Sequence, residues 1–195
     1  FIGNETYSPA RQELCEMFHN NGNGTFTNLT QQLGLDIYAC FKAVKWGDIN
    51  NDQLPDLYLS NLGGKNLLIV NRGGTTPANW QFEDISIKSK AGGTKSWSTG
   101  VAMVDVNSDG WLDIYVCNSG DVKGDNKENE LFINNGDLTF TESAEKYGLN
   151  DKGYSTHASF FDYDKDGDLD CYILNNSFRA IGSFDLRKNL RNTRD

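Results

Sequence analysis

Several features that would place this chain in a common protein class are missing from its sequence. It has no apolar run near the ~18 residues that a membrane-spanning helix needs, and helical periodicity is found nowhere at length. Positive charge is scarce, because 18 Lys and Arg face 27 Asp and Glu, for a formal net charge of −9. Since the phosphate backbone of nucleic acids selects basic surfaces, we expect no nucleic-acid partner.

The chain has too few cysteines for disulfide bridges to stabilise a fold of this size. Four occur in 195 residues: Cys15, Cys40, Cys117 and Cys171. The last two lie on equivalent predicted strands but three positions out of step, which is roughly 10 Å and too far for a bridge. We interpret all four as small buried apolar residues, and they leave the redox compartment open.

Against these absences, one acidic pattern occurs three times. The segments are "DINNDQLPD" (48–56), "DVNSDGWLD" (105–113) and "DYDKDGDLD" (162–170), named here the first, second and third acidic loops. Their starts are 57 residues apart, and a fixed period of this size is typical of stacked repeat architectures. The loops hold 11 of the 27 acidic residues, and charges this close repel unless a cation neutralises them.

The repeat extends beyond the acidic loops. Asn61, Asn118 and Asn175 each lie five residues past the last Asp of their loop, and Asn4 keeps the same step of 57. On this frame the chain starts partway through a repeat, and the visible lack of a signal peptide carries little weight. We therefore expect one array of repeats rather than separate domains. Its expected divisions are a partial unit at 1–36, units at 37–93 and 94–150, and a partial unit with an irregular tail at 151–195.

Four short strands are predicted in each repeat, separated by Gly, Asn and Asp clusters. In the repeat at 37–93 they are 41–48, 56–61, 66–71 and 81–87. The second strand, "DLYLSN", is apolar or aromatic on both faces, unlike a sheet with one face in water. One short stretch, "SAEKYGL", is the exception that suggests a helical turn. The predicted fold class is all-β, a partial β-propeller with blades of four antiparallel strands, and a solenoid of stacked sheets is the alternative.

The acidic loops carry oxygen ligands at alternate positions. Side-chain oxygens recur at positions one, three, five and nine, and a backbone carbonyl at position seven can add another. Oxygen ligands without nitrogen or sulfur suit a hard cation, and flexible carboxylate-rich loops suit Ca²⁺ better than Mg²⁺. We expect one calcium ion per loop, about three in all. The candidate ligands are Asp48, Asn50, Asp52, Leu54 and Asp56; Asp105, Asn107, Asp109, Trp111 and Asp113; and Asp162, Asp164, Asp166, Asp168 and Asp170.

Position six separates the first loop from the other two. It holds Gly110 and Gly167, where a positive φ costs little, but Gln53 in the first loop. With the same backbone, Gln53 would be strained by about 1 kcal/mol, so we expect the lowest affinity there and the highest in the third loop. An EF-hand is excluded, because position twelve is apolar in all three loops and strands flank them. A solvated turn that binds nothing is the alternative for any single copy.

These stretches resemble the FG-GAP/VCBS-type repeats of calcium-binding β-propellers. The resemblance rests on "WGDINNDQLPDLYLSN", "VDVNSDGWLDIYVCN", "FDYDKDGDLDCYILN" and "LFINNGDLTF", and covers nearly the whole chain. "FIGNE" and "MFHNNGNGTFTNLT" are similar to the subgroup found beside ASPIC/UnbV domains, the cartilage acidic protein-like group. The resemblance implies integrin α-like blades with calcium between the first and second strands, in a secreted or cell-surface (periplasmic or extracellular) setting. The Arg-rich tail at 177–195 departs from the pattern.

The expected function is binding or scaffolding without catalysis, with calcium in a structural role. The expected partners are a protein or glycan ligand that the sequence does not identify, and the rest of the chain's own propeller. One alternative is part of a polysaccharide-active lyase or hydrolase, with His157, Lys42, Lys45 and Tyr154 as candidate groups. His157 aligns with Ala43 and Gly100 of the other repeats, which favours an ordinary strand histidine. A passive spacer or adhesin module is the other alternative.

Overall fold

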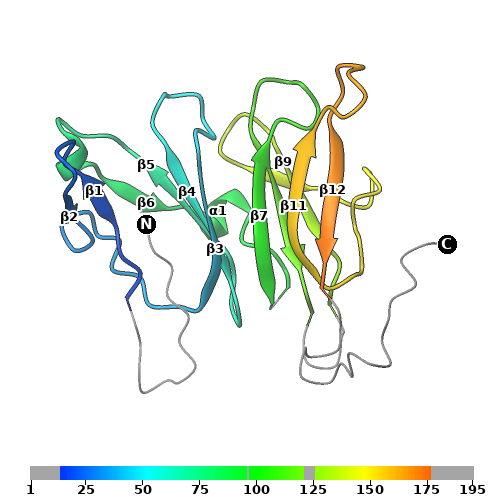
Figure 1. Cartoon of the computed structure of the whole chain (residues 1–195), viewed down its shortest axis with the longest axis horizontal. Helices are drawn as coiled ribbons and strands as arrows, with labels where there is room; N and C mark the ends of the chain where they lie inside the picture. Colours follow the sequence, from blue (N-terminus) through cyan, green and yellow to red (C-terminus); the bar gives the residue numbers. More distant parts are fainter. Residues whose placement is uncertain (1–13, 96, 121–125, 177–195) are drawn as a thin grey trace.

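The computed structural model describes residues 14–95, 97–120 and 126–176, and this part of the chain is built almost entirely from β-strands (Figure 1). Two four-stranded antiparallel sheets lie between two two-stranded ones. The outer pairs are β1 (Phe18–Asn20) with β2 (Phe26–Asn28), and β11 (Ser155–Phe161) with β12 (Asp170–Asn175). The complete sheets are β3 (Phe41–Gly47), β4 (Asp56–Asn61), β5 (Leu67–Asn71) and β6 (Phe82–Asp84), then β7 (Ser98–Val104), β8 (Asp113–Asn118), β9 (Glu130–Asn134) and β10 (Phe140–Glu142).

Each complete sheet follows chain order from one edge to the other, so every strand pairs with its sequence neighbour. The first strands β3, β7 and β11 contact one another across neighbouring sheets, and Figure 1 shows them near the middle of the molecule. Close contact is helped by Gly100 on β7, where a Cβ atom would lie 2.9 Å from the Cα of His157 on β11. The first strands are therefore the inner strands, and β6 and β10 lie at the outer edges.

Second strands are buried on both faces, as the sequence predicts. Leu57 and Leu59 of β4 enter a core shared with the β1–β2 side, whereas Tyr58 enters the core between the two complete sheets. On β8, Ile114 belongs to that same middle core, and Tyr115 belongs to a third core with β11–β12. Alternate side chains of one strand thus stabilise two different interfaces, because successive residues of a strand point to opposite faces.

Sheets stacked face to face with their first strands together are the blades of a β-propeller, so the predicted fold class is confirmed. The described residues form part of such an array and do not close a ring. The boundaries assigned to the blades stay a prediction. Asn4 and the tail at 177–195 lie outside the described residues. Among the helices that are described, none has the length and apolarity required to cross a membrane.

The fourth strands are shorter than predicted. The range 81–87 contains β6 and then α1 (Ser86–Ser89), because the Asp84 carboxylate accepts the Ser86 amide at 2.9 Å and turns the chain. The stretch "SAEKYGL" forms a turn rather than a helix, closed by the Leu149 amide on the Ala144 carbonyl at 2.8 Å. A 3₁₀ turn, η1 (Pro77–Asn79), precedes β6.

Each repeat closes with a residue in a left-handed backbone conformation, which is glycine in only two of the three repeats. Gly34 and Gly148 adopt left-handed backbone conformations with φ of 65° and 68°. Lys90, with φ of 65°, takes this place in the middle repeat, so the buried Ala91 corresponds to Leu35 and Leu149 rather than to a glycine.

Burial of the cysteines differs from the prediction. None of the four forms a disulfide, and Cys15 and Cys117 are buried, but Cys40 and Cys171 are only partly buried. Burial raises the pKa of the Cys117 thiol to about 12, so this thiol stays protonated and behaves as a small apolar residue.

Candidate metal centres

The three acidic loops lie at the same end of the molecule. Each connects a first strand to a second strand, in the hairpins β3–β4, β7–β8 and β11–β12, and Figure 1 shows these hairpin tips along one side. The fold therefore places every candidate ligand at an equivalent position in its own blade. This common placement follows from the 57-residue repeat.

Position one organises the turn of each loop. The two carboxylate oxygens of Asp48 accept the amides of Asp52 at 3.2 Å and Gln53 at 2.8 Å. Asp105 accepts the amides of Asp109 at 3.1 Å and Gly110 at 2.8 Å in the same way. Each of these carboxylates is therefore held in place by two backbone amides of its own loop.

Positions three and five interact with each other. The Asn50 amide nitrogen donates to Asp52 Oδ2 at 2.9 Å, and Asn107 donates to Asp109 at the same distance. Both asparagines also accept the position-five amide through Oδ1 at 3.2 Å. These amide oxygens face the interior of the turn, where a cation would need them.

Position nine is buried at the base of the hairpin in the two complete blades. Asp56 accepts the amides of Ile49 at 3.0 Å and Asn71 at 2.8 Å, and its side chain is fully buried. Burial raises the pKa of Asp56 to about 6, and the negative charges of Asp52 and Asp48 add to the rise. A cation beside these carboxylates would remove this penalty, because an opposite charge favours the ionised form.

Asp113 repeats this arrangement in the second loop. It accepts the amides of Val106 at 3.0 Å and Asn134 at 2.8 Å, and burial raises its pKa. Asp170 accepts the Tyr163 amide at 3.0 Å in the third loop but is only partly buried. The three position-nine residues are therefore equivalent in backbone placement and differ in solvent access.

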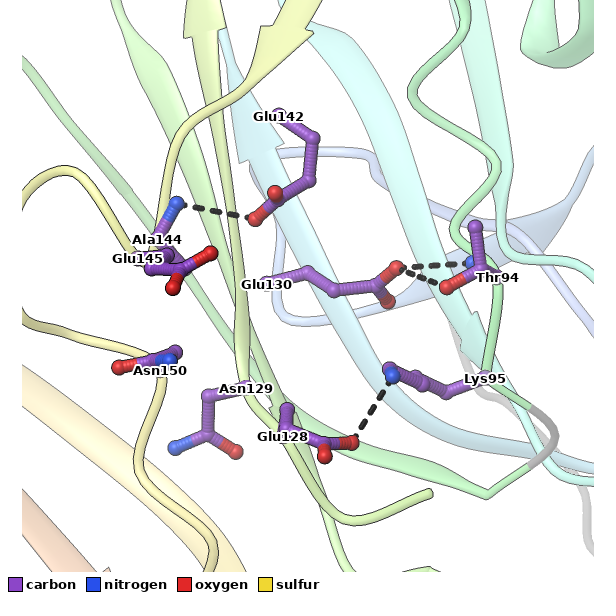
Figure 2. Close-up of a pocket in the computed structure, with 9 residues that line it drawn as sticks. All are labelled: Thr94, Lys95, Glu128, Asn129, Glu130, Glu142, Ala144, Glu145 and Asn150. Carbon is purple, nitrogen blue, oxygen red and sulfur yellow. Dashed lines mark hydrogen bonds and ion pairs between the residues drawn. The ribbon is translucent and has the colours of Figure 1, made fainter.

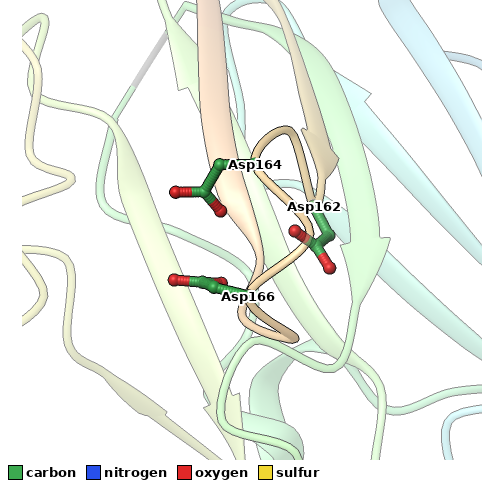
Figure 3. Close-up of side chains that lie close together, drawn as sticks. All are labelled: Asp162, Asp164 and Asp166. Atoms are coloured by element: carbon green, nitrogen blue, oxygen red, sulfur yellow. The ribbon is translucent and has the colours of Figure 1, made fainter.

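The third loop brings three carboxylates together at an exposed hairpin tip (Figure 3). One oxygen each from Asp162, Asp164 and Asp166 lies within 4.8 Å of the others. Oxygens that bind calcium at about 2.3–2.6 Å lie up to roughly 5 Å apart across the ion, so this spacing fits. The donor set is oxygen only, which matches calcium and excludes a preference for zinc.

Position seven of each loop takes part through its backbone atoms rather than its side chain. The amides of Leu54, Trp111 and Asp168 donate to the position-five carboxylates at 2.8, 2.9 and 2.9 Å. Their carbonyls are the proposed ligand atoms, and that role stays a prediction. These hydrogen bonds from the position-seven amides close the turn in all three loops.

Backbone conformation agrees between the loops. Gln53 adopts φ of 68°, in the same region as Gly110 at 88° and Gly167 at 98°. Position four is also left-handed in every loop, at Asn51, Ser108 and Lys165 with φ of 57°, 58° and 65°. The sequence analysis missed position four, and its only signal was Asn51, a residue type that tolerates this conformation.

Neighbouring loops are linked by side-chain hydrogen bonds. Asn51 of the first loop donates to the Gly110 carbonyl of the second at 3.0 Å. Asn134, at the end of β9, donates to the Ile49 carbonyl at 2.8 Å and to the Leu112 carbonyl at 3.1 Å. The first two loops are therefore connected through the protein, which sequence spacing alone did not indicate.

A second acidic cluster, not predicted from sequence, lines a pocket of about 320 Å³ toward the opposite end of the sheets (Figure 2). Three of its four carboxylates, those of Glu128, Glu130 and Glu142, are engaged in hydrogen bonds or ion pairs. Glu130 accepts the Thr94 amide and hydroxyl at 2.8 Å, Lys95 lies 2.9 Å from Glu128, and Glu142 accepts the Ala144 amide at 2.9 Å. We interpret these contacts as structural, because they hold the loop before β7 against β9.

The residues considered for catalysis do not converge. Lys42 and Lys45 lie on β3, whereas His157 lies on β11, with β7 between these strands. Tyr154 lies before β11 with the Lys127 ammonium 4.3 Å from its ring centroid. These four residues therefore do not form a shared acid–base or nucleophilic site.

Comparison with known proteins agrees with the geometry. A family model for the FG-GAP-like repeat matches residues 10–59, 48–116 and 117–173. The chain is 28% identical over 174 residues to cartilage acidic protein 1 of Xenopus tropicalis, a match that covers 86% of this chain. The chain spans about a quarter of the length of that relative, since 25% of the relative is matched.

Proposed function

Because this chain belongs to the FG-GAP-like repeat family, we propose that it is an extracellular β-propeller-type binding or scaffolding module stabilised by calcium in its three acidic loops. The observation that carries the proposal is the convergence of Asp162, Asp164 and Asp166, placed equivalently to two further loops of the same backbone geometry. The proposed ligands are the fifteen residues at positions one, three, five, seven and nine.

The proposed role of calcium is structural. In its absence, each loop holds carboxylates in mutual repulsion, and Asp56 and Asp113 are buried with raised pKa values. A bound ion would replace repulsion with coordination and fix the hairpin between an inner strand and a buried second strand. Because the ion binds the folded state, it raises stability by mass action.

An extracellular setting is part of the proposal. Calcium sites in extracellular modules work at dissociation constants of about 10⁻⁴–10⁻³ M, and exposed loops of this kind suit that range. The similarity to cartilage acidic protein 1 supports the same setting. Dispersal of the four candidate catalytic residues over different strands favours a non-enzymatic module with a protein or glycan ligand.

The test is thermal unfolding with and without calcium. We expect calcium removal to lower the melting temperature by many degrees and calcium to restore it more effectively than magnesium, since irregular carboxylate loops suit the larger ion. Calorimetric titration of the calcium-free chain should find about three sites. A melting curve unaffected by chelation would contradict the proposal.

A matched pair of variants assigns the sites. Asp166→Asn removes one carboxylate from the third loop and is expected to remove the tightest site. Asp36→Asn removes an exposed carboxylate outside the loops and is expected to leave all sites intact. Equal loss of calcium in both variants would show that the binding is diffuse charge attraction rather than loop coordination.

A further inference from the structure

An exposed asparagine links the first acidic loop to the second. Asn51 lies at position four of the first loop, and its side-chain amide donates to the Gly110 carbonyl of the second loop at 3.0 Å. The amide of Trp111 belongs to the same peptide unit as that carbonyl, and it donates to Asp109 at 2.9 Å. One peptide unit of the second loop therefore connects Asn51 to the carboxylate at position five.

Asn134 forms a second link inside the protein, where it is 3% exposed. Its side-chain amide donates to the Ile49 carbonyl at 2.8 Å, and its backbone amide donates to Asp113 at 2.8 Å. Ile49 in turn donates its own amide to Asp56 at 3.0 Å. The position-nine carboxylates of the two loops are thus joined through two buried residues.

Packing reinforces these links where the first loop begins. A Cβ atom at Gly47, which precedes Asp48, would lie 2.5 Å from the Met103 sulfur and 3.1 Å from Leu112 Cδ1. Side chains of β7 and the second loop therefore pack directly on the backbone that leads into the first loop. Because close-packed protein interiors are hard to compress and transmit strain, a shift of the second loop is passed to the first.

The second and third loops lack the exposed link. Position four of the second loop is Ser108, which has the same left-handed backbone as Asn51 but a shorter side chain without an amide. Both loops are fully described, and no hydrogen bond joins 105–113 to 162–170. On the 57-residue frame, the counterpart of Asn134 for this pair falls in the tail at 177–195, outside the described residues. The contrast at position four therefore distinguishes the first pair of loops.

We infer that Asn51 and Asn134 couple the first two acidic loops, so that calcium in the second loop raises the calcium affinity of the first. This inference rests on the proposed calcium role. When the second loop is filled, Asp109 and Asp113 are fixed, and the two links hold Asn51 and Ile49 on either side of a proposed first-loop ligand. Part of the ordering that the first loop needs is then already complete. By linkage, calcium in the first loop raises the affinity of the second by the same factor.

Electrostatics acts in the opposite direction. Each of the first two loops has three aspartates at its ligand positions, so one calcium ion changes the charge of the loop from −3 to −1 and weakens its attraction for an ion in the neighbouring loop. Salt screens this effect, with a Debye length of about 3 Å at 1 M, and the effect acts on both pairs of neighbouring loops. Coupling through the two asparagines persists in salt and is confined to the first pair.

Site-resolved calcium titration by nuclear magnetic resonance tests the coupling. The position-six amide donates to the position-one carboxylate in every loop, so the resonances of Gln53, Gly110 and Gly167 report the filling of the first, second and third loops. Asp109→Asn weakens the second site but keeps an oxygen for the Trp111 amide. In about 1 M salt, this substitution should raise the calcium concentration at the Gln53 midpoint about fivefold or more, and leave the Gly167 midpoint nearly unchanged.

A matched pair of glycine variants tests the role of Asn51. Asn51→Gly removes the exposed link, and glycine accepts the φ of 57° at this position without strain. In this background, Asp109→Asn should shift the Gln53 midpoint less than in the unaltered chain. Ser108→Gly makes the same backbone change in the second loop, where position four has no link to the third, and should leave the full shift. Both residues are exposed, so the cores stay intact, and circular dichroism confirms that each variant is folded.

The outcomes separate the coupling from the calcium role. A Gln53 midpoint that does not respond to Asp109→Asn, or equal shifts in the two glycine backgrounds, would overturn the inference. Either result would leave the proposed function standing, because the loops would still fill with calcium. If none of the three resonances responded to calcium, the proposed function would be contradicted and the coupling with it.

Discussion

Gln53 adopts the left-handed conformation that glycine holds at the same position of the other two loops. A side chain in this region costs about 1 kcal/mol relative to glycine, so the first acidic loop forms at the expense of backbone strain. We expect Gln53→Gly to raise the free energy of unfolding by about 1 kcal/mol. The gain should appear as a higher melting temperature and, in calorimetric titration, as tighter calcium binding by the weakest site.

Two substitutions check that backbone strain is the cause. Gln53→Ala keeps a Cβ atom at the same φ and should give little of the gain. Gly110→Ala imposes the strain on the second loop, where no heavy atom lies within 4 Å of the added Cβ, and should cost about 1 kcal/mol. A stabilising Gln53→Ala would point to the amide side chain instead of the backbone.

At this scale the sequence predicts residue types better than their contacts. The oxygen-bearing residues at alternate positions of the acidic loops could be predicted from the sequence, because the same pattern occurs three times at fixed spacing. The burial of Asp56 and its hydrogen bond from the Asn71 amide could not be predicted from the sequence, since they depend on the third strand packing beneath the loop. Lys90 in a left-handed conformation was not predicted, because it is the C-cap of the short helix α1, a place where glycine is the usual sequence signal.

Among the elements, the inner strands β7 and β11 approach most closely at Gly100. A Cβ atom there would meet the carbonyl oxygen of Thr156 and lie 2.9 Å from the Cα of His157, so backbone must move to admit it. We expect Gly100→Ala to lower the free energy of unfolding by about 1–3 kcal/mol, as overpacking of a closely packed interface does. Chemical denaturation with calcium present measures this change.

Gly92→Ala is the matched control. Gly92 is also buried, but its added Cβ would meet neighbours at 3.4 Å or more, which is ordinary contact distance. Its effect should therefore stay within about 0.5 kcal/mol of zero, as for changes that disturb no packing. Equal effects at both glycines would show that a general cost of replacing a buried glycine, not the approach of β7 to β11, decides the change in stability.

The bounds of some strands could be predicted from the sequence, and the bounds of others could not. Second strands such as Asp56–Asn61 match their predicted bounds, since apolar residues on both faces and flanking Asp and Asn define them. The fourth strand of the same blade was overestimated, because "QFEDISI" alternates like a strand while Asp84 turns the backbone at Ser86. Side-chain-to-backbone hydrogen bonds of this kind compete with a sheet without altering the hydrophobic pattern.

For the whole molecule, the buried loop carboxylates predict how stability depends on pH when calcium is absent. The folded pKa of Asp56 is raised to about 6 from 3.8 in the absence of folding, mainly by burial, and Asp113 shifts the same way. Between these values the folded state binds more protons, so stability falls as pH rises from about 4 to 6. The loss from Asp56 is on the order of 3 kcal/mol and is complete above that window.

Calcium should reverse this dependence, because protons then compete with the ion. The measurement is the melting temperature between about pH 4.5 and 7, in metal-free buffer and with calcium, for the native chain and for Asp56→Asn. Asp56→Asn should make the metal-free curve shallower and leave the part that Asp113 contributes. Identical metal-free curves for the two chains would show that Asp56 is ionised without penalty.

The general arrangement followed from the repeat, whereas contacts between blades did not. A period of 57 residues indicated equivalent loops in successive sheets. The hydrogen bond from Asn51 to Gly110 required the structure, because it joins residues from different repeats. The glutamate pocket around Glu130 lies within the repeat at 94–150, but it also required the structure, because it brings the loop before β7 beside β9 and β10.

Although the acidic loops recur every 57 residues, the connections between other strands differ in length from blade to blade. The β4–β5 connection spans 62–66 and the β8–β9 connection spans 119–129, whereas the β5–β6 connection at 72–81 is longer than β9–β10 at 135–139. Strand registers are the same in both blades despite these differences. Foreign peptides, such as an affinity tag or a fluorescent-dye acceptor sequence, should therefore be accepted at the β5–β6 connection, while a single residue added inside Asp56–Asn61 would exchange side chains between two cores.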